Sequence, residues 1–313
     1  MDPDSEGIKR AAEIIRSGEI VAFPTETVYG LGADGLNPNA LCKIFEAKNR
    51  PSDNPIILHF ESVGAIRNLF SSLPQNFDLV TSSFCPGPIT MVLPRPKSIP
   101  PEVSAGLDTV AVRVPGNQLA RELIQVVGGP IAAPSANESG SPSATTAQHV
   151  LDDLDGKIAG VIDGGSCEVG VESTVVDITN ETVRVLRPGG VSLEQLADVL
   201  GYEPEIVSDV ASGSPGVRHD HYQPKCQVIL YTGFPPRITE DDGIISLTYD
   251  PPRAKYSVRM KNLDEYARRL YDAMREADNE KISRLFMEKP MNVGIGRALL
   301  DRLFRASGQT LVK

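Results

Sequence analysis

Residues 48–55, KNRPSDNP, place two positive charges, Lys48 and Arg50, two residues apart in an acidic chain. The prolines at positions 51 and 55 prevent this short polar segment from continuing as a helix. Arginine presents a planar fork that matches a carboxylate or a phosphate, and lysine adds a compact charge. The pair therefore suits a polyphosphate, or a phosphate beside a carboxylate.

Four other polar segments follow or open a predicted strand: PTETVYG (24–30), PSANESG (134–140), VEST (171–174) and LRPGG (186–190). We expect them to gather around one cavity if the sheet curves. The serine hydroxyls and backbone N–H groups of PSANESG would complete a phosphate site. Neither GxxxxGK[ST] nor GxGxxG at a strand-to-helix turn occurs, so the two common nucleotide fingerprints do not apply.

Each candidate residue also has a purely structural interpretation. Lys48 and Arg50 would equally suit a solvated loop with surface ion pairs. Arg113 fits either a surface position on a half-exposed strand or a ligand clamp, and His59, which ends an apolar strand, fits a buried structural histidine. Strand-end hydroxyls and turn formers account equally well for Thr25, Thr27, Ser135 and Asn137.

No arrangement typical of nucleophilic catalysis is visible, because no Ser-His-Asp or Cys-His set can be recognised and Cys85 has no evident base. The four cysteines lie far apart without a CxxC pair, and only four histidines accompany them. This spacing predicts reduced, mostly buried thiols and no metal site built from protein side chains. The residues alone indicate an acidic α/β protein with a site for a small anion.

Composition limits the class of protein further. The chain has 313 residues, with 31 Lys and Arg against 41 Asp and Glu and a net charge of −10. This length predicts two domains. The negative charge argues against tight, sequence-independent binding of nucleic acid, which needs many Lys and Arg at phosphates. The N-terminus lacks the pattern of a signal peptide, and no apolar stretch reaches the roughly 20 residues that span a bilayer, so we expect a cytoplasmic protein.

The first two hundred residues are expected to be rich in strands. A helix with apolar positions from Ile8 to Ile15 should end at Gly18, and a second helix should run from Pro38 to about Lys48. Residues 25–35, TETVYGLGADG, are predicted to be a loop that leads into a short element. Strands are predicted at EIVAFP (19–24), IILHF (56–60), GPITMVLP (87–94), TVAVRVP (109–115), PIAAP (130–134), GVIDGG (160–165), STVVDIT (173–179) and TVRVLRPGG (182–190), the last two as a hairpin, before a helix at 192–200. Alternation in TVAVRVP points Arg113 away from its valine face.

Residues 208–225 contain turn formers and little periodicity, and they predict a linker between domains. Strands are expected at QVILYTG (227–233), GIISLT (243–248), YSVRM (256–260) and SRLFME (283–288), with helices at 263–276 and 293–307. The predicted organisation is therefore a catalytic domain over 1–207, a linker over 208–225 and a small α/β domain over 226–313.

Seven segments in the same order closely resemble the YrdC-like family of threonylcarbamoyl-AMP synthases. They are FPTETVYGLG (23–32), KNRPSDNPIILH (48–59), PGPITMVL (86–93), VAVRVP (110–115), PIAAPSAN (130–137), ESTVVD (172–177) and LRPG (186–189). HYQP (221–224) is similar to the tyrosine-bearing linker of the long, two-domain form. The resemblance implies a curved mixed sheet with a basic concave cavity, followed by a smaller Rossmann-like α/β domain.

The resemblance also implies the reaction: L-threonine, bicarbonate or carbon dioxide, and ATP give L-threonylcarbamoyl-AMP and pyrophosphate. This is the first step towards N6-threonylcarbamoyladenosine in tRNA, and a separate transferase complex would use the product, with only transient contact. Mg²⁺ would enter with ATP, without ligands from protein side chains. Neither stable binding of nucleic acid nor contact with a membrane is expected.

By the same resemblance, Lys48 and Arg50 would hold the ATP phosphates and the carbamate oxygens. Threonine would be oriented by Thr27, His59, Arg113 and Ser173. The nucleotide would be contacted by Ser135, Asn137 and Arg187, with Asn54 near the phosphates. Tyr222 in the linker would cover the loaded cavity.

Three alternatives remain open at this point. The chain would also fit a module that binds RNA or a nucleotide without catalysis, or a regulatory nucleotide-binding protein that has lost activity. A carbamoyl-transfer protein of hydrogenase maturation has a similar domain, but it should also contain an acylphosphatase-like segment and zinc-type cysteine clusters, and neither is present in the sequence.

Overall fold

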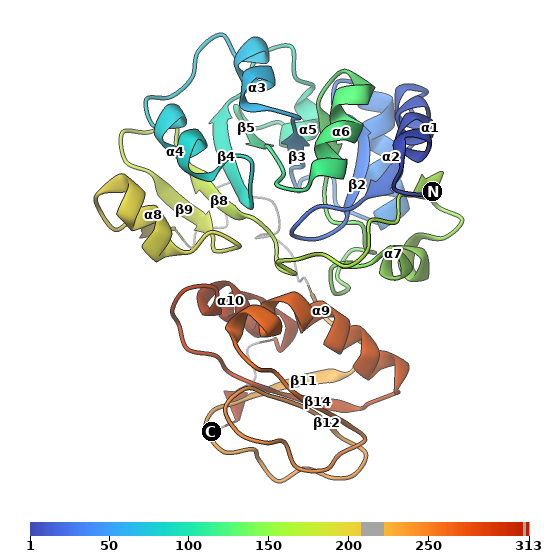
Figure 1. The fold of residues 1–313 in the computed structure, drawn as a ribbon, viewed down its shortest axis with the longest axis vertical. Coiled ribbons are helices and arrows are strands. Elements are labelled where there is room, and N and C mark those ends of the chain that lie inside the picture. Colours follow the sequence, from blue (N-terminus) through green and yellow to red (C-terminus); the bar gives the residue numbers. More distant parts are fainter. Residues whose placement is uncertain (208–221, 309–310, 313) are drawn as a thin grey trace.

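The computed structural model of the chain describes residues 1–207, 222–308 and 311–312. Figure 1 shows a large α/β unit, coloured blue to yellow, and a small one in orange and red, which we call the N-terminal and C-terminal domains. This arrangement confirms the predicted fold class of a mixed-sheet α/β domain with a smaller α/β domain. No helix within the described ranges is both long enough and apolar enough to cross a membrane.

The N-terminal domain is built on a mixed sheet. In chain order its elements are α1 (Ser5–Arg16), β1 (Val21–Phe23), β2 (Gly30–Asp34), α2 (Pro38–Lys48), β3 (Ile57–His59), α3 (Val63–Leu69), α4 (Phe77–Phe84), β4 (Ile89–Pro94), α5 (Pro101–Ser104), β5 (Thr109–Arg113), α6 (Gln118–Val127), β6 (Ile131–Ala133), α7 (Ala147–Leu154), β7 (Gly160–Val161), β8 (Thr174–Asp177), β9 (Arg184–Arg187), α8 (Leu193–Leu200) and β10 (Glu205–Ile206). In the described residues the ten strands are ordered β10, β9, β8, β4, β5, β3, β6, β2, β1, β7.

The predicted strands are present, and β8 and β9 form the expected antiparallel hairpin. The prediction of a loop over residues 25–35 is wrong at its end, because Gly30–Asp34 form strand β2, which pairs with β1 and β6. Its glycines serve close packing between strands. A Cβ added at Gly32 would lie 2.8 Å from the Phe23 ring and 2.9 Å from Ile131.

Helices α3 to α7 were not predicted. Most are short, and three of them begin at a side chain that caps the first turn: Ser62 for α3, Asn117 for α6 and Thr146 for α7. The expectation of mostly buried thiols is correct for only two of the four free cysteines. Cys167 and Cys226 are buried, whereas Cys42 is exposed and Cys85 is half-buried.

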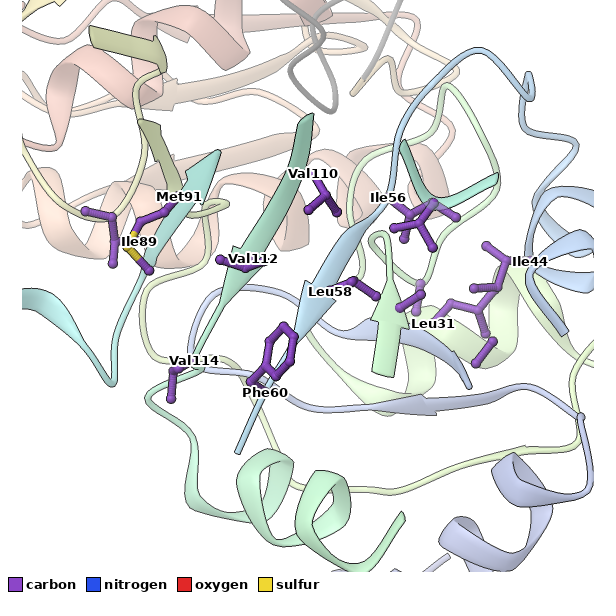
Figure 2. Packing of buried hydrophobic residues seen from close by; sticks show 14 of the residues in the cluster. Leu31, Ile44, Ile56, Leu58, Phe60, Ile89, Met91, Val110, Val112 and Val114 are labelled. Carbon is purple, nitrogen blue, oxygen red and sulfur yellow. The ribbon is translucent and has the colours of Figure 1, made fainter. Parts of the chain in front are cut away.

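The two faces of the central strands have different roles. Val110, Val112 and Val114 belong to the main hydrophobic cluster, which Figure 2 shows together with Leu58 of the neighbouring strand β3. Arg113 alternates with these valines and therefore projects from the opposite face, as predicted. Strand register then places His59 directly beside Arg113, because these two residues are partners in the parallel β3–β5 pair.

The C-terminal domain has a five-stranded parallel sheet in the order β13, β12, β14, β11, β15. Its elements are β11 (Gln227–Tyr231), β12 (Gly243–Ser246), β13 (Tyr256–Arg259), α9 (Leu263–Asn279), β14 (Arg284–Glu288), α10 (Gly296–Ala306) and β15 (Leu311–Val312). Helices α9 and α10 lie between this sheet and the N-terminal domain (Figure 1). Most of the predicted linker, residues 208–221 including His221, lies outside the described residues.

Candidate active site

One cavity collects residues from the ends of several strands and from the end of helix α2. It contains about 700 Å³ of space, including its open mouth. Its walls include ten of the eleven residues predicted for the site: Thr27, Lys48, Arg50, His59, Arg113, Ser135, Asn137, Ser173, Arg187 and Tyr222. Asn54 is the exception, because it is buried behind the wall, where its backbone oxygen lies 3.4 Å from Arg50 Nε.

The conformation of residues 48–50, KNR, is set by the way helix α2 ends. Lys48 is the last helical residue, and Asn49 follows in the left-handed conformation with φ of 51°. Asparagine is one of the few residues that accept this conformation readily. Lys48 then donates from Nζ to the carbonyl oxygens of Ser135 (2.6 Å) and Asn137, so one charge of the pair is anchored to the PSANESG segment.

Besides Arg113, three cationic side chains line the cavity: Lys48, Arg50 and Arg187. Burial lowers the pKa of Lys48 well below its usual value, with a smaller contribution from Arg50, and burial lowers the pKa of Arg50 to about 10. Burial likewise lowers the pKa of Arg187. Because desolvation and mutual repulsion both disfavour these charges, a polyanion in the cavity would stabilise them.

Arg113 is held in place by a buried carboxylate. Its Nη2 donates to Glu26 Oε1 at 2.7 Å, and both side chains are nearly inaccessible. Burial is the largest influence and raises the pKa of Glu26, but the Arg113 charge and the hydrogen bonds to the carboxylate together outweigh it, and the pKa is lowered. Arg113 Nε has no hydrogen-bond partner among the described residues. A buried, unsatisfied donor on the wall of a cavity is suited to a ligand.

Two contacts between hydroxyl groups lie at the cavity, and of their four members Thr25, Thr27 and Ser173 line it. Thr25 Oγ1 donates its only proton to the Val28 carbonyl oxygen (2.7 Å), so Thr27 must be the donor in the 2.9 Å contact between the two threonines. Thr27 therefore offers lone pairs to a ligand N–H group. Ser173 Oγ lies 2.7 Å from Thr90 Oγ1, and the carbonyl oxygen of Ser173 accepts from Arg187 at 3.0 Å.

His59 is neutral in the folded protein. Burial, with a contribution from Arg113, lowers the pKa of its imidazole from 6.5 to about 3. Its Nδ1 lies 3.2 Å from the carbonyl oxygen of Ile57, and its ring meets that of Phe23 edge-on. His59 can therefore orient a ligand through hydrogen bonds, but it does not add a positive charge to the site.

The low pKa of His59 predicts a pH-dependent stability that His59→Gln removes. Between pH 3 and 6.5 the unfolded chain binds a proton at His59 that the folded chain does not, so the free energy of unfolding falls as pH falls. At roughly 1.4 kcal/mol per pH unit, this residue alone should cost about 2 kcal/mol between pH 6.5 and 5. Urea unfolding at pH 7 and pH 5 measures the difference. An equal pH-dependent loss in wild type and variant would contradict the expectation.

Several wall residues were not among the predicted site residues. Glu172 is one of them. It lies buried between the two domains, and the polar VEST segment did not indicate that this charge would be buried. The others include Thr25, Ser139, Ser141 and Ser143. Ser139, Ser141 and Ser143 recur at every second position, but residues 138–141 form a turn closed by Ser141 N and the Glu138 carbonyl oxygen, so this spacing is not the alternation of an extended segment. Ser139 Oγ and Asn137 Oδ1 also have no hydrogen-bond partner within the described residues.

The side chains that the structure describes do not form a ready metal site. In the part of the chain that the structure describes, no group of three or more His, Cys, Asp or Glu residues is placed to hold a metal ion. The cavity wall instead presents lysine, arginine and hydroxyl groups, which suit the oxygens of phosphates and carboxylates.

Comparisons with known proteins agree with these features. A family model described as "Telomere recombination" matches residues 13–189, and one described as "Threonylcarbamoyl-AMP synthase, C-terminal domain" matches residues 191–308. Threonylcarbamoyl-AMP synthase of Bacillus subtilis is 40% identical over 98% of this chain and 94% of its own length, and that of Pyrococcus abyssi is 41% identical over 98% and 95%. The crystal structure of P. abyssi Sua5 complexed with L-threonine has a TM-score of 0.92 at 39% identity, covering 99% of this chain and 96% of that one. The chain therefore belongs to the threonylcarbamoyl-AMP synthase family, in its two-domain form.

Proposed function

We propose that the cavity joins L-threonine, bicarbonate or carbon dioxide, and ATP to give L-threonylcarbamoyl-AMP and pyrophosphate, the first step of N6-threonylcarbamoyladenosine formation in tRNA. The observation that carries this proposal is that two groups of residues line one cavity. The first group is the cations Lys48, Arg50 and Arg187, and the second is Arg113, Thr27 and His59. The first group suits a triphosphate and the second an amino acid. Similarity to the P. abyssi protein that was crystallised with L-threonine supports the second assignment.

Lys48 and Arg50 would carry the phosphoryl chemistry. The threonine amine captures carbon dioxide as a carbamate and releases a proton, and a carbamate oxygen then attacks the α-phosphorus while pyrophosphate leaves. Transfer of this kind depends on positioning and charge neutralisation rather than on a protein nucleophile. Mg²⁺ bound to the ATP phosphates would neutralise further charge, and it would need no protein carboxylate.

Threonine would be held by groups with complementary roles. The unsatisfied N–H group of Arg113 would donate to its carboxylate, the Thr27 hydroxyl would accept from its amine, and neutral His59 and Ser173 would complete its orientation. Ser135, Asn137 and Arg187 would contact the nucleotide. Because Asn54 does not reach the cavity wall, we assign it a supporting role at the Arg50 loop.

Tyr222 is proposed to cover the loaded cavity and to slow hydrolysis of the product. It is buried, lines the cavity and stacks on Tyr271 of the C-terminal domain with ring centroids 5.4 Å apart. Tyr222→Ala should raise the rate of product decay severalfold, because water gains access, with a smaller effect on the initial rate. Following the adduct over time after ATP is exhausted measures this rate. Tyr249→Ala, at an aromatic pair with Phe234, is the control, and unchanged decay in Tyr222→Ala would contradict the proposal.

The activity is tested by incubating the protein with ATP, Mg²⁺, threonine and fresh bicarbonate, and by omitting each in turn. We expect pyrophosphate release and a threonylcarbamoyl adduct of AMP, identified by mass spectrometry, only when all substrates are present. Nucleotide binding without any adduct would support the binding-module alternative. Steeply salt-dependent binding of tRNA would support an RNA-binding module instead.

Three further assignments belong to the same proposal. The domain limits are 1–207, 208–225 and 226–313, supported by the two separate sheets. The location is cytoplasmic, which is consistent with four free cysteines. The product would pass to a transferase complex through transient contact.

A further inference from the structure

The carboxylate of Glu172 forms the centre of a polar network in the wall of the cavity. Its Oε1 accepts from the Ser143 hydroxyl at 2.7 Å, both of its oxygens lie 3.0 Å from the Tyr271 hydroxyl, and its Oε2 accepts from Arg302 Nε at 2.8 Å. Arg302 and Tyr271 are fully buried, and Glu172 is 7% exposed. Such a network holds its members in one geometry, since a broken bond would leave a buried charge or donor unpaired.

This network joins the two domains at the cavity. Glu172 and Ser143 belong to the N-terminal domain and line the cavity, whereas Tyr271 lies on α9 and Arg302 on α10 of the C-terminal domain. Arg302 and Tyr271 do not line the cavity themselves. They contact it only through other side chains.

The same two residues also support Tyr222. The Arg302 guanidinium lies 5.6 Å from the centroid of the Tyr222 ring, and that ring is stacked on Tyr271. Arg302 additionally pairs with Asp301 at 2.6 Å. Arg302 and Tyr271 of the C-terminal domain therefore each contact both Glu172 and the ring of Tyr222.

Glu172 in turn sets two groups on the cavity wall. Because the Ser143 hydroxyl gives its proton to Glu172, only its lone pairs remain for a ligand. The backbone oxygen of Glu172 accepts from Gly190 N at 3.1 Å, which fixes the segment that presents Ser173. Loss of the carboxylate's partners would move both groups, and small displacements in an active site cost much of the rate.

We propose that Arg302 and Tyr271 are positioning residues of the synthase active site: through Glu172 they orient Ser143 and Ser173, so that the C-terminal domain completes the threonine side of the cavity. This inference rests on the proposed function. It adds to that function a specific task for two residues of the C-terminal domain that do not line the cavity themselves.

Charge in the network is balanced by neighbouring groups. Burial is the largest influence and raises the pKa of Glu172, but the charges of Arg302 and Arg187 and the hydrogen bonds from Ser143 and Arg302 together outweigh it and bring this pKa to about 2. The other ionisable groups that face the carboxylate are the phenols of Tyr271 and Tyr222. Removal of Arg302 takes away the largest favourable charge, so the pKa of Glu172 should rise in Arg302→Met.

The test compares Arg302→Met and Tyr271→Phe with Arg297→Met in the full-length protein. Arg297 is also on α10 and also pairs across the domains, with Glu194 at 3.2 Å, but neither residue lines the cavity. We expect Arg302→Met to lower kcat/KM for threonine about a hundredfold and Tyr271→Phe about fivefold, with Arg297→Met within about twofold of wild type. Thermal melting identifies any variant that does not fold.

The pH profile separates positioning from general loosening of the interface. In Arg302→Met the acid limb of kcat/KM should move to higher pH, and adding Glu172→Gln should abolish that shift because no carboxylate remains to titrate. A folded Arg302→Met with a wild-type rate and acid limb, or an equal loss in Arg297→Met, would overturn the inference. If Arg302→Met does not fold, a wild-type rate in Tyr271→Phe would overturn it. Absence of any adduct with wild-type protein would instead refute the proposed function.

Discussion

Replacing Lys48 with methionine is expected to reduce the rate of threonylcarbamoyl-AMP formation by about a thousandfold or more, because the reacting phosphates lose a buried cation. Methionine fills nearly the same space without a charge. Since burial already disfavours the charged form of Lys48, the variant should fold with little loss of stability. The initial rate of adduct formation and the thermal melting temperature measure the two effects. Arg50→Ala should likewise abolish product formation in a folded protein.

Lys43→Met provides the matched control for this prediction. Lys43 lies on the same helix, α2, but its side chain is 39% exposed and pairs with Glu19 at 2.7 Å. Surface pairs of this kind contribute little to stability, so the control should keep both its rate and its melting temperature. Near-normal turnover in Lys48→Met or Arg50→Ala would refute the assignment of these two cations to the phosphates and the carbamate.

The second large effect is expected for the double variant Glu26→Gln/Arg113→Gln. It removes the charge proposed to bind the threonine carboxylate without leaving a buried, unpaired Glu26. Loss of a buried, charged contact of this kind should raise KM for threonine about a hundredfold, while KM for ATP changes much less. Steady-state kinetics with each substrate varied in turn measure both constants.

Two comparisons make this prediction specific. Arg113→Gln alone should also be less stable than the double variant, because it leaves the Glu26 carboxylate buried without its partner. Arg95→Gln is the control, since Arg95 follows strand β4, its guanidinium donates to the backbone oxygens of Leu107 and Ile99, and it does not line the cavity. An unchanged KM for threonine in the double variant would show that Arg113 does not bind the threonine carboxylate.

The local pattern of the sequence was sufficient to predict many elements, and the family resemblance pointed to ten of the residues that line the cavity. Alternation in TVAVRVP correctly separated the valines from Arg113, and Pro51 correctly marked the end of the helix near Lys48. It was insufficient for β2, where glycines that serve close packing resemble those of a turn. Nor did the pattern indicate that Asn54, which lies in a motif of site residues, would be buried without lining the cavity.

The sequence by itself determined the family, the positions of most strands and many of the residue types that line the cavity, because these depend on short-range periodicity, on turn residues and on motifs of a few positions. Only the tertiary structure decided which charges are paired. Glu26 and Arg113 are 87 residues apart, and Glu172 and Arg302 are 130 apart. Arg302 lies on an amphipathic helix, where an arginine normally faces water, and it is buried here because α10 packs against the N-terminal domain. Burial and pairing arise from contacts between distant segments, and no local pattern encodes them.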